Sequence, residues 1–423
     1  MPTGSGHVAH PGATVESYRI FLHPTISCYT CCVDATTNPY SPGAGRRPYA
    51  LTGRDQEIAS WQTVLARVGS GRTDRSIILY GLRGVGKTVL LGEYRRLAED
   101  AGWWVGQAEG GLGTDDFRGT LAKALYPVIR EATQRGVGER MRAALATFKA
   151  FSVSVDTSGA WKFGVEVHPS TGRADTGNLE TDLLELVADL GRAAQEQGRG
   201  IAILIDEMQE LSPQALAALC AACHSAGQRE LPFYVAGAGL SSLPRVLAEA
   251  KSYSERLFTY LPIGQLDPEA ARRAIVEPSA AEGVAWESDG VGHVVEAAGR
   301  YPYFLQEFGQ QAWACAAGPF VVTVADARVG AADGLHRLDN GFFRSRWDRA
   351  TPGERAYLTV MAVDGDGPSQ AGDVAERLHR TVSSLGPTRA GLIAKGLAYS
   401  PEYGQVGFTV PGMADFIKRQ PEP

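Results

Sequence analysis

The stretch Ile77-Ile-Leu-Tyr-Gly-Leu-Arg-Gly-Val-Gly-Lys-Thr88 is an apolar run that leads directly into Gly-x-x-x-x-Gly-Lys-Thr. A buried strand followed by this pattern and then by a helix is the phosphate-binding P-loop. Its glycines allow backbone conformations that other residues disfavour, so successive amide N–H groups can face phosphate oxygens. The alternative is a glycine-rich turn that matches by chance, which the complete pattern after an apolar strand disfavours.

The side chains of this loop have distinct expected roles. Lys87 supplies a positive charge for the β- and γ-phosphates of ATP, and Thr88 supplies a hydroxyl ligand for Mg²⁺. The positive end of the helix that begins here also favours an anion. We therefore expect ATP with Mg²⁺ to contact the loop and the first helical turn, at Gly81, Arg83, Gly84, Val85, Gly86, Lys87, Thr88 and Val89.

A second apolar run, residues 201–205, ends in Asp206 and Glu207, as a buried parallel strand does at its carboxyl edge. In this interpretation, which makes the segment a Walker B strand, Asp206 holds Mg²⁺ through water. Glu207 orients or deprotonates the water that attacks the γ-phosphorus. The alternative is a strand end whose carboxylates cap the next helix. Together the two motifs predict ATP hydrolysis as well as binding.

Length and composition are those of a globular protein. The chain has 423 residues, a net charge of -6 and 44% hydrophobic residues, enough for two or three domains. No apolar stretch approaches the roughly 18 to 20 residues of a membrane helix, and the first residues lack a secretory signal pattern, so a cytoplasmic location is expected. The acidic balance argues against general nucleic-acid affinity but leaves room for a local basic patch.

The cysteines suggest two metal or cofactor sites that we disfavour. Cys28, Cys31 and Cys32 lie in a leader with three histidines, but no second ligand pair follows at a recognised zinc spacing. Cys220-Ala-Ala-Cys223-His224 matches the haem-attachment motif. It lies in an alanine-rich helical stretch, so we expect buried core residues there.

The order of patterns predicts four segments. Residues 1–37 are expected to be a disordered leader, 38–264 the nucleotide-binding domain, 265–340 a helical lid, and 341–423 a further domain. Within the second segment, alternating apolar and polar residues on either side of a Thr-Ser-Gly turn predict an inserted β-hairpin at about 151–168.

Three positions are candidate sensors of the nucleotide. Ser241 and Ser242 follow an apolar strand and either sense the γ-phosphate or cap the next helix. Arg256 is either an arginine finger, which stabilises the charge of the transition state, or a surface ion-pair residue. The turn Gly299-Arg-Tyr-Pro302 places a cation and an aromatic ring at a helix start, where they contact the nucleotide or simply form a turn.

The last eighty residues change character. Helical patterns at 354–363, 369–378 and 381–395 precede a β-hairpin at 397–410, an order typical of a winged helix. Its third helix would face a DNA major groove, with a modest supply of polar and cationic residues at Arg377, Arg380, Arg389, Lys395 and Gln405. We favour DNA binding, and protein docking is the alternative because a dense basic stripe is missing.

With Leu51-Thr-Gly-Arg-Asp-Gln-Glu57 before the P-loop and Ile205-Asp-Glu-Met-Gln209, the chain resembles the AAA+ ATPases. More narrowly, it resembles the origin-recognition-like and archaeal-type ATPases and their STAND relatives. The resemblance implies an α/β fold, a doubly wound parallel-sheet P-loop NTPase domain with strand order 5-1-4-3-2, a helical lid and a C-terminal winged helix. It also implies that adenine lies near Gly53 and Pro302, and that Arg256 is the finger.

Two departures from this resemblance concern hydrolysis. Gly237-Ala-Gly239 lacks the usual polar sensor, and Arg300-Tyr-Pro302 keeps the proline of the STAND Gly-x-Pro motif but replaces its glycine. Both leave ATP binding intact while predicting hydrolysis that is slow or stimulated by a partner.

Three classes of function follow from these features. The first is an ATP-driven switch whose nucleotide state is reported to DNA through the winged helix, and the second is an ATPase that docks proteins through the winged helix and hairpin. An arginine finger supplied by a neighbouring subunit would require a homo-oligomer. The third class, phosphate transfer to a small molecule, is disfavoured because the lid and winged helix serve no such chemistry.

Overall fold

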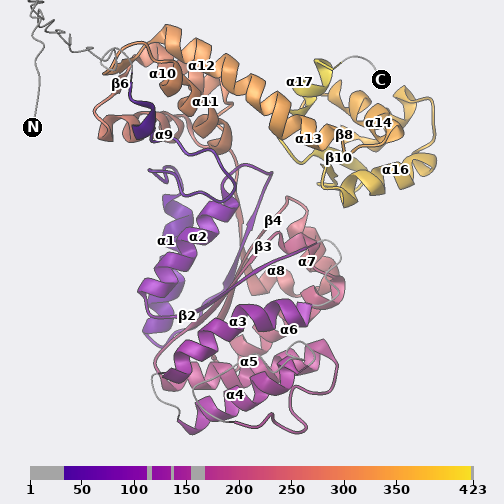
Figure 1. Ribbon diagram of the computed structural model, residues 1–423. Coiled ribbons are helices and arrows are strands. Elements are labelled where there is room, and N and C mark those ends of the chain that lie inside the picture. The colour runs from indigo at the N-terminus through magenta and orange to yellow at the C-terminus, as the bar shows by residue number, and fades with distance from the viewer. Residues whose placement is uncertain (1–32, 112–116, 135–137, 154–166, 421–423) are drawn as a thin grey trace, which may run out of the picture.

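The computed structural model of the chain describes residues 33–111, 117–134, 138–153 and 167–420. Within these residues, a five-stranded parallel sheet with the order β2-β3-β4-β1-β5 forms the centre of the nucleotide-binding domain (Figure 1). Its strands are β1 (Ser76–Tyr80), β2 (Trp104–Glu109), β3 (Ile201–Asp206), β4 (Phe233–Gly239) and β5 (Phe258–Pro262). Read from β5, this is the order 5-1-4-3-2, so the predicted doubly wound α/β fold is confirmed.

Helices cover both faces of the sheet because successive strand residues point to opposite sides. Ile77 and Leu79 pack with α1 (Asp55–Gly69) and α2 (Lys87–Asp100). Ile78 belongs to a larger core on the opposite face. The helices on that face are α3 (Phe117–Gln134), α4 (Glu139–Ser152), α5 (Leu179–Glu196), α6 (Pro213–Gln228), α7 (Leu243–Ala250) and α8 (Ser254–Leu257).

The carboxyl ends of neighbouring strands meet at one edge of the sheet. Tyr80 of β1 lies beside Gly239 of β4, and Ile205 of β3 lies beside Gly237 of the same strand. Asp206 is paired with Glu109 at the end of β2. The P-loop and the two acidic residues therefore leave the sheet at the same edge, although more than a hundred residues separate them in the sequence.

The predicted hairpin at about 151–168 differs from the structure at its first residues. Phe151 and Ser152 form the last turn of α4, and Phe151 is fully buried. The predicted turn of the hairpin lies outside the described residues. The alternating pattern that predicts a strand begins at Phe151, but Phe151 is the last buried aromatic residue of the amphipathic helix α4.

The lid region contains the helices α9 (Pro268–Ala281), α10 (Ser288–Ala297), α11 (Pro302–Cys315) and α12 (Val324–Arg337). A short parallel pair, β6 (Ala285–Trp286) and β7 (Val321–Val322), joins its loops. The packed chain begins earlier than the expected leader boundary at residue 37. Val33 is only 8% exposed, and the indole of Trp313 donates a hydrogen bond of 2.9 Å to the carbonyl of Asp34.

The predicted boundary at residue 340 falls within continuous helix. A π-helical segment, η3 (Leu338–Phe343), follows α12 directly, and α13 (Arg344–Trp347) follows η3. The cap residues between these elements all have right-handed helical angles. We call residues 324–347 the rod; it leads from the lid to the C-terminal unit that is described next (Figure 1).

The C-terminal unit, residues 348–420, combines helices with a small antiparallel sheet of order β8-β10-β9. Its helices are α14 (Pro352–Ala362), α15 (Ala371–Arg377), α16 (Val382–Ala394) and α17 (Met413–Lys418). The strands are β8 (Ser369–Gln370), β9 (Ala398–Tyr399) and β10 (Gln405–Phe408). The helix predicted at 369–378 begins two residues later, because Ser369 and Gln370 pair with β10.

Lid, rod and C-terminal unit share one hydrophobic core. Phe343 of the rod stacks on Phe416 of α17 with ring centroids 5.4 Å apart, and it also contacts Phe304 of the lid at 6.1 Å. Aromatic contacts of this kind bury large areas and prefer defined geometries. The lid and the C-terminal unit therefore pack against each other through this core.

Among the described residues, no helix is both long and apolar enough to cross a membrane. Cys220 and Cys223 are buried within α6, as predicted for core residues. Burial raises the pKa of Cys220 to about 12, so its thiol stays protonated. The candidate zinc ligands Cys28, Cys31 and Cys32 lie outside the described residues.

Candidate nucleotide-binding site

The P-loop connects β1 to α2 and is shaped by its glycines. Gly84 and Gly86 have φ angles of +83° and +92°, in the left-handed region that glycine adopts without strain. A Cβ atom on Gly81 would collide with the carbonyl oxygen of Ile263, which follows β5. Gly81 is therefore needed for the close approach of two chain segments, and it does not line the pocket itself.

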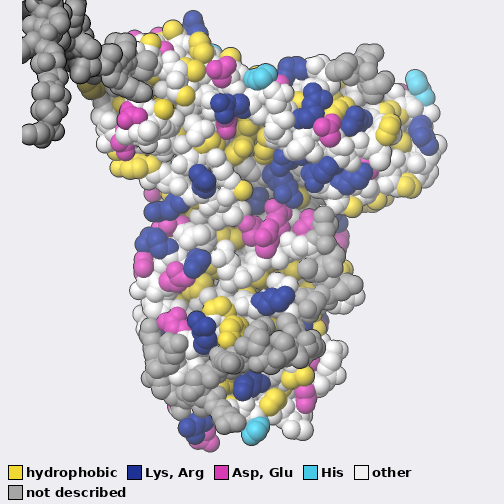
Figure 2. Space-filling model, viewed as in Figure 1, with side chains coloured by type: hydrophobic (Ala, Val, Ile, Leu, Met, Phe, Trp, Pro, Cys, Tyr) yellow, Lys and Arg dark blue, Asp and Glu magenta, His cyan; other side chains and the backbone are white. Residues whose placement is uncertain are grey.

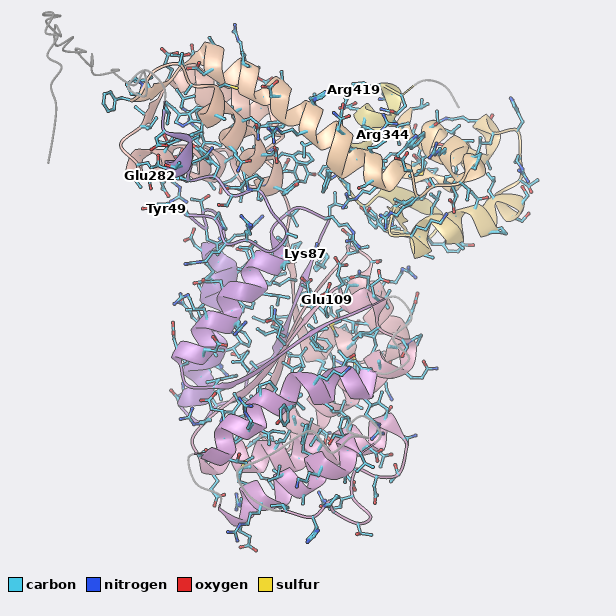
Figure 3. All side chains as sticks on the ribbon, viewed as in Figure 1. Tyr49, Lys87, Glu109, Glu282, Arg344 and Arg419 are labelled. Carbon is cyan, nitrogen blue, oxygen red and sulfur yellow. The ribbon has the colours of Figure 1, made fainter. Side chains whose placement is uncertain are left out.

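Lys87 lies at the junction of the sheet and the lid (Figure 3). Its side chain is buried, and Nζ donates hydrogen bonds to the carbonyl oxygens of Gly81 at 3.0 Å and Leu82 at 2.7 Å. Burial lowers the pKa of Lys87 to about 8, while the nearby carboxylates of Glu207 and Asp206 oppose that shift. The ammonium form therefore predominates at neutral pH, as phosphate binding requires.

Thr88 and Asp206 form a direct contact between the P-loop and the end of β3. The Thr88 hydroxyl donates a hydrogen bond of 2.6 Å to Oδ2 of Asp206, whose Oδ1 accepts one of 2.8 Å from the backbone N–H of Glu207. Hydroxyl and carboxylate oxygens suit Mg²⁺, which usually keeps several waters and binds through substrate phosphates. These two side chains thus fit Mg²⁺ delivered with a triphosphate.

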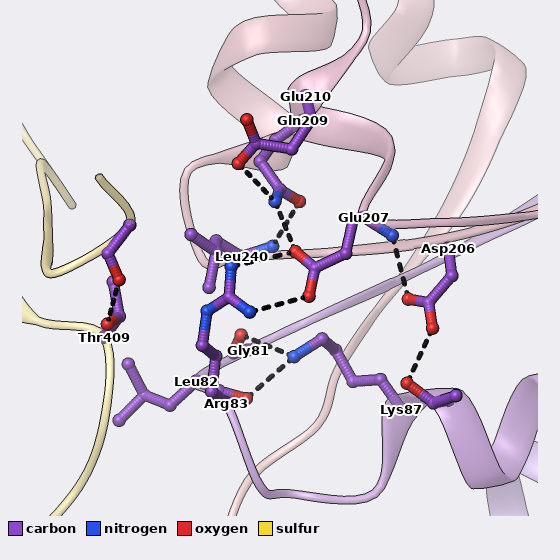
Figure 4. Close-up of polar contacts among 12 residues, drawn as sticks. Gly81, Leu82, Arg83, Lys87, Asp206, Glu207, Gln209, Glu210, Leu240 and Thr409 are labelled. Atoms are coloured by element: carbon purple, nitrogen blue, oxygen red, sulfur yellow. Dashed lines mark hydrogen bonds and ion pairs between the residues drawn. The ribbon is translucent and has the colours of Figure 1, made fainter. Parts of the chain in front are cut away.

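Glu207 is bound by Arg83, a P-loop residue (Figure 4). The two guanidinium nitrogens of Arg83 lie 3.1 and 3.3 Å from the two carboxylate oxygens of Glu207. Gln209 donates to the same carboxylate at 2.6 Å and accepts from the backbone N–H of Leu240. Glu207 itself has a φ of +45°, an unusual value for a residue with a side chain and one that is common at functional sites.

Sequence reasoning missed this Arg83–Glu207 pair and the role of Gln209. Arg83 occupies one of the variable positions of the P-loop pattern, so the motif carries no information about its partner. The only available signal was the short spacing between Glu207 and Gln209, which places both residues at the same strand end.

One pocket contains most of the predicted ligand residues. It has a volume of about 870 Å³, and Arg83, Gly84, Val85, Gly86, Lys87, Thr88, Val89, Asp206, Glu207 and Pro302 all line it. Gly53 does not line it, but its neighbours Thr52 and Arg54 do. The buried Arg54 donates to the carbonyls of Val85 at 3.1 Å and Gly264 at 2.5 Å. Arg54 thereby fixes the P-loop against the segment that enters the lid, a role that sequence reasoning missed.

Among the candidate sensor positions, Pro302 lines this pocket, but Ser241, Ser242, Arg256 and Arg300 do not. Arg256 is exposed on α8, and Arg300 lies at the α10–α11 turn; neither lines the pocket of its own chain. Ser242 forms no side-chain cap for α7. Ser241 interacts with the hydroxyl of Tyr399, in the C-terminal unit.

The C-terminal unit also touches the P-loop. The backbone N–H of Arg83 donates a hydrogen bond of 2.9 Å to the carbonyl of Thr409, just after β10. Thr409 is buried, and its hydroxyl donates to the carbonyl of Gly396 at 2.8 Å. This contact and the Ser241–Tyr399 contact place the C-terminal sheet at the edge of the nucleotide-binding site.

The fold, the glycine-shaped loop and the paired carboxylates define a P-loop ATPase. More narrowly, residues 50–235 match the AAA ATPase domain family. Residues 340–417 match a family described as a domain of unknown function, DUF8462. No curated protein matches the chain in sequence.

Three solved structures are similar to the chain at low sequence identity. A Walker-type ATPase of Pyrococcus abyssi is 14% identical with a TM-score of 0.55, covering 88% of this chain and 97% of its own. The Aeropyrum pernix Orc1 protein in complex with DNA is 19% identical with a TM-score of 0.41, covering 88% and 93%. The Thermotoga maritima RuvB Holliday junction branch migration motor is 14% identical with a TM-score of 0.42, covering 89% and 99%. The likeness to the Pyrococcus ATPase supports the fold alone.

Proposed function

We propose that the protein is an ATP-hydrolysing switch in which the P-loop relays the nucleotide state to the C-terminal unit. One observation carries this proposal. Arg83 binds the carbonyl of Thr409 through its backbone N–H and the carboxylate of Glu207 through its side chain. A single P-loop residue thus joins the candidate catalytic carboxylate to the C-terminal unit.

A bound triphosphate would alter this connection through charge. The γ-phosphate brings negative charge to the end of the pocket where Arg83 lies, and it competes with Glu207 for the guanidinium. Release of Glu207 would leave its carboxylate free to orient the attacking water. A movement of Arg83 that also shifts its backbone would strain or break its N–H hydrogen bond to Thr409.

The remaining residues have conventional roles in this proposal. Lys87 would bind the β- and γ-phosphates, and Thr88 with Asp206 would hold Mg²⁺, which supplies charge neutralisation when bound. Adenine would lie between the strand-entry segment near Thr52 and the lid near Pro302, both of which line the pocket. Arg256 can serve as an arginine finger only in a neighbouring subunit, so that role requires a homo-oligomer.

Nucleotide binding and turnover of three variants test the switch. Lys87→Ala should bind ATP at least about 10- to 100-fold more weakly, because a charged hydrogen-bond donor is lost. Glu207→Gln should bind ATP but lose about 10²- to 10⁴-fold in turnover, the usual contribution of a general base. Arg256→Ala should reduce turnover only at protein concentrations where the protein oligomerises. The proposal fails if wild-type protein with Mg²⁺ binds no ATP in calorimetry.

We infer further that the C-terminal unit is a winged helix. Helices α14, α15 and α16 with the β8-β10-β9 sheet supply its parts in the expected order. Lys and Arg balance Asp and Glu in residues 348–420, in contrast to the acidic chain as a whole. Figure 2 shows Lys and Arg side chains gathered on the rod and the C-terminal unit, above a patch of Asp and Glu on the nucleotide-binding domain. Duplex DNA is the partner we propose for this unit.

The cations predicted to face DNA are not all available. Arg377 forms a bidentate ion pair with Asp364, with N–O distances of 2.6 and 2.7 Å, and Lys395 pairs with Glu354 at 2.5 Å. Within the described residues, Arg380 and Arg389 have no carboxylate within 4.0 Å. If DNA binds α16, these two arginines supply most of the charge.

Retention on duplex DNA at several salt concentrations tests this partner. Binding should weaken as salt rises, and Arg389→Gln should reduce the salt slope by about one phosphate contact. Arg377→Gln is the matched control, because its charge is already neutralised by Asp364. Absence of binding at low salt would exclude DNA.

Docking of a protein is the second candidate, favoured by the outer face of α16. Val382 is 50% exposed, Ile393 is 38% exposed, and Tyr403 at the hairpin is fully exposed. Such apolar side chains suit a protein partner better than a phosphate backbone. Under this candidate, the wild-type protein should not be retained on duplex DNA. Val382→Ser should leave ATP turnover unchanged.

A further inference from the structure

The nucleotide pocket contains a cation that no sequence motif indicated. Arg346 belongs to α13, at the end of the rod, yet it lines the same pocket as the P-loop. Phe342 of η3 and Tyr303 of α11 line the pocket beside it. The pocket thus brings the P-loop together with a residue more than 250 positions later in the chain.

The side chain of Arg346 is held in place by local contacts. Its Nη1 donates a hydrogen bond of 2.6 Å to the carbonyl of Phe342, and the guanidinium lies 4.0 Å from the centroid of the Phe342 ring. That ring lies 5.1 Å from the ring of Tyr303, whose backbone N–H donates to the carbonyl of Gly84 at 3.3 Å. A chain of direct contacts therefore runs from Arg346 to the P-loop.

The charge of Arg346 has no partner in the described part of the chain. No carboxylate there lies within 4.0 Å of its guanidinium, although the side chain is half-buried. Burial first, and then the positive charges of Arg83 and Arg349, lower the pKa of Arg346 to about 10. An unpaired cation near other cations is unfavourable until an anion joins them.

The neighbours of Arg346 indicate which anion fits. Arg83 binds Glu207 at the carboxyl edge of the sheet, where hydrolysis is expected, and Arg83 is among the charges that act on Arg346. This end of the pocket is therefore the end for the terminal phosphate. A guanidinium can bind two phosphate oxygens at once, which gives both strength and orientation.

We propose that Arg346 binds the terminal phosphate of ATP within the same chain and so makes the rod sense ATP rather than ADP. This inference rests on the proposed ATPase function and assigns its sensor. The turn at Arg300, where the resemblance placed a lid sensor, does not line the pocket. Because Arg346 is on the rod, its contact with phosphate would act directly on the element that carries the C-terminal unit.

Paired affinities for ATP and ADP test the proposal in the full-length protein with Mg²⁺. Arg346→Gln should weaken ATP binding by about 10- to 100-fold, the usual effect of losing a hydrogen bond to a charged group. ADP binding should change less than about threefold, because ADP lacks the terminal phosphate. Arg328→Gln is the matched control: it removes an exposed arginine of the rod that does not line the pocket, and it should change neither affinity.

Two results would overturn the proposal. Equal weakening of ATP and ADP would show that Arg346 supports the pocket without reading the terminal phosphate, and unchanged ATP affinity would show that it makes no contact. Should Arg346→Gln not fold, Arg346→Lys decides. This variant keeps the positive charge but cannot form a bidentate hydrogen bond with phosphate, so we expect a selective loss of ATP affinity of about 3- to 10-fold. Wild-type ATP affinity in this variant would refute the assignment.

Failure of this inference is distinct from failure of the proposed function. If wild-type protein binds ATP and Lys87→Ala does not, the ATPase function stands whatever the Arg346 variants show. If wild-type protein binds no ATP, the function itself fails, and the sensor falls with it.

Discussion

The C-terminal unit makes two contacts with the rest of the molecule, and they differ in kind. Its contact with the lid is an aromatic core that includes Phe304, Phe343 and Phe416. Its contact with the P-loop is polar and small, with one backbone hydrogen bond from Arg83 to Thr409 and the Ser241–Tyr399 contact. The free energy gained by burying apolar surface is roughly proportional to the area buried, whereas one hydrogen bond contributes about 1 kcal/mol.

This difference in energy indicates that one of the two contacts is permanent and the other can break. The aromatic joint should persist in every nucleotide state, while the polar contact with the P-loop can break at little cost. Lid, rod and C-terminal unit would then move together over the nucleotide. Three measurements sharpen or break this comparison.

The largest effect is expected at the aromatic joint. Phe343→Ala should lower the free energy of unfolding by about 3 to 5 kcal/mol, because the ring is only 1% exposed. Denaturant titration measures the loss, and hydrogen exchange should accelerate in both α11 and α17. The control is Phe320→Ala, which removes the same ring at a position that is 70% exposed and should change stability by less than about 0.5 kcal/mol. Acceleration in α17 alone would show that lid and C-terminal unit are separate bodies.

An intermediate effect is expected from pH, through the titration of Lys87 in the P-loop. Burial lowers the pKa of Lys87 from 10.5 to about 8, so between these values the unfolded chain holds more protons than the folded one. In that window the nucleotide-free protein gains stability from this group as pH rises. ATP requires the ammonium form, and its affinity should fall by about tenfold per pH unit above about pH 8.

Calorimetry between about pH 7 and about pH 9.5 measures that slope. Lys87→Arg stays charged over the whole range, so whatever affinity it retains should not depend on pH. A wild-type affinity that is flat across the range would contradict the assignment of Lys87 as the titrating phosphate ligand.

The smallest effect is expected from the Arg83–Glu207 ion pair, which lies next to the polar contact. Arg83→Ala should lower stability by about 1 kcal/mol or less, because both side chains of the Arg83–Glu207 pair remain about a quarter to a third exposed. The loss should shrink at high salt. Arg349→Ala, an exposed control, should have no such salt-dependent effect. A loss of several kcal/mol would mean that the Arg83 contacts are structural and cannot act as a switch.

The nucleotide-binding core was predictable because its signals are local. A strand, eight P-loop residues and a strand ending in two acids each form a contiguous pattern, and the parallel sheet brings Lys87, Thr88 and Asp206 together. The positions of Arg256 and Arg300 relative to the pocket depend on how later elements dock. No local pattern describes that docking, so the finger role of Arg256 stays a prediction.

The contacts that the sequence could not reveal all join distant segments. Thr409 and Arg346 approach the P-loop only because the rod passes over the pocket and the aromatic core fixes its direction. The helical pattern at 354–363 indicates that a helix forms there, but it does not indicate the direction in which the rod carries that helix. The boundary expected at residue 340 lies inside continuous helix, although Asn340-Gly341 is a dipeptide typical of turns.

The orientation of the side chains at the end of the rod depends on the number of residues in the rod and on the π-helical segment η3. An α-helix turns by about 100° per residue, and a π-helical turn accommodates about one residue more than an α-helical turn. Phe342 and Arg346, which lie within and just after this segment, thus have their orientation set by how many residues precede them. Deleting a single residue from the α-helical part of the rod, α12, would rotate everything downstream by about 100°, turning the arginine away from the nucleotide while leaving the composition of the helix almost unchanged. A deletion within η3 would instead convert the wide turn into an α-helical one and keep the orientation of the arginine.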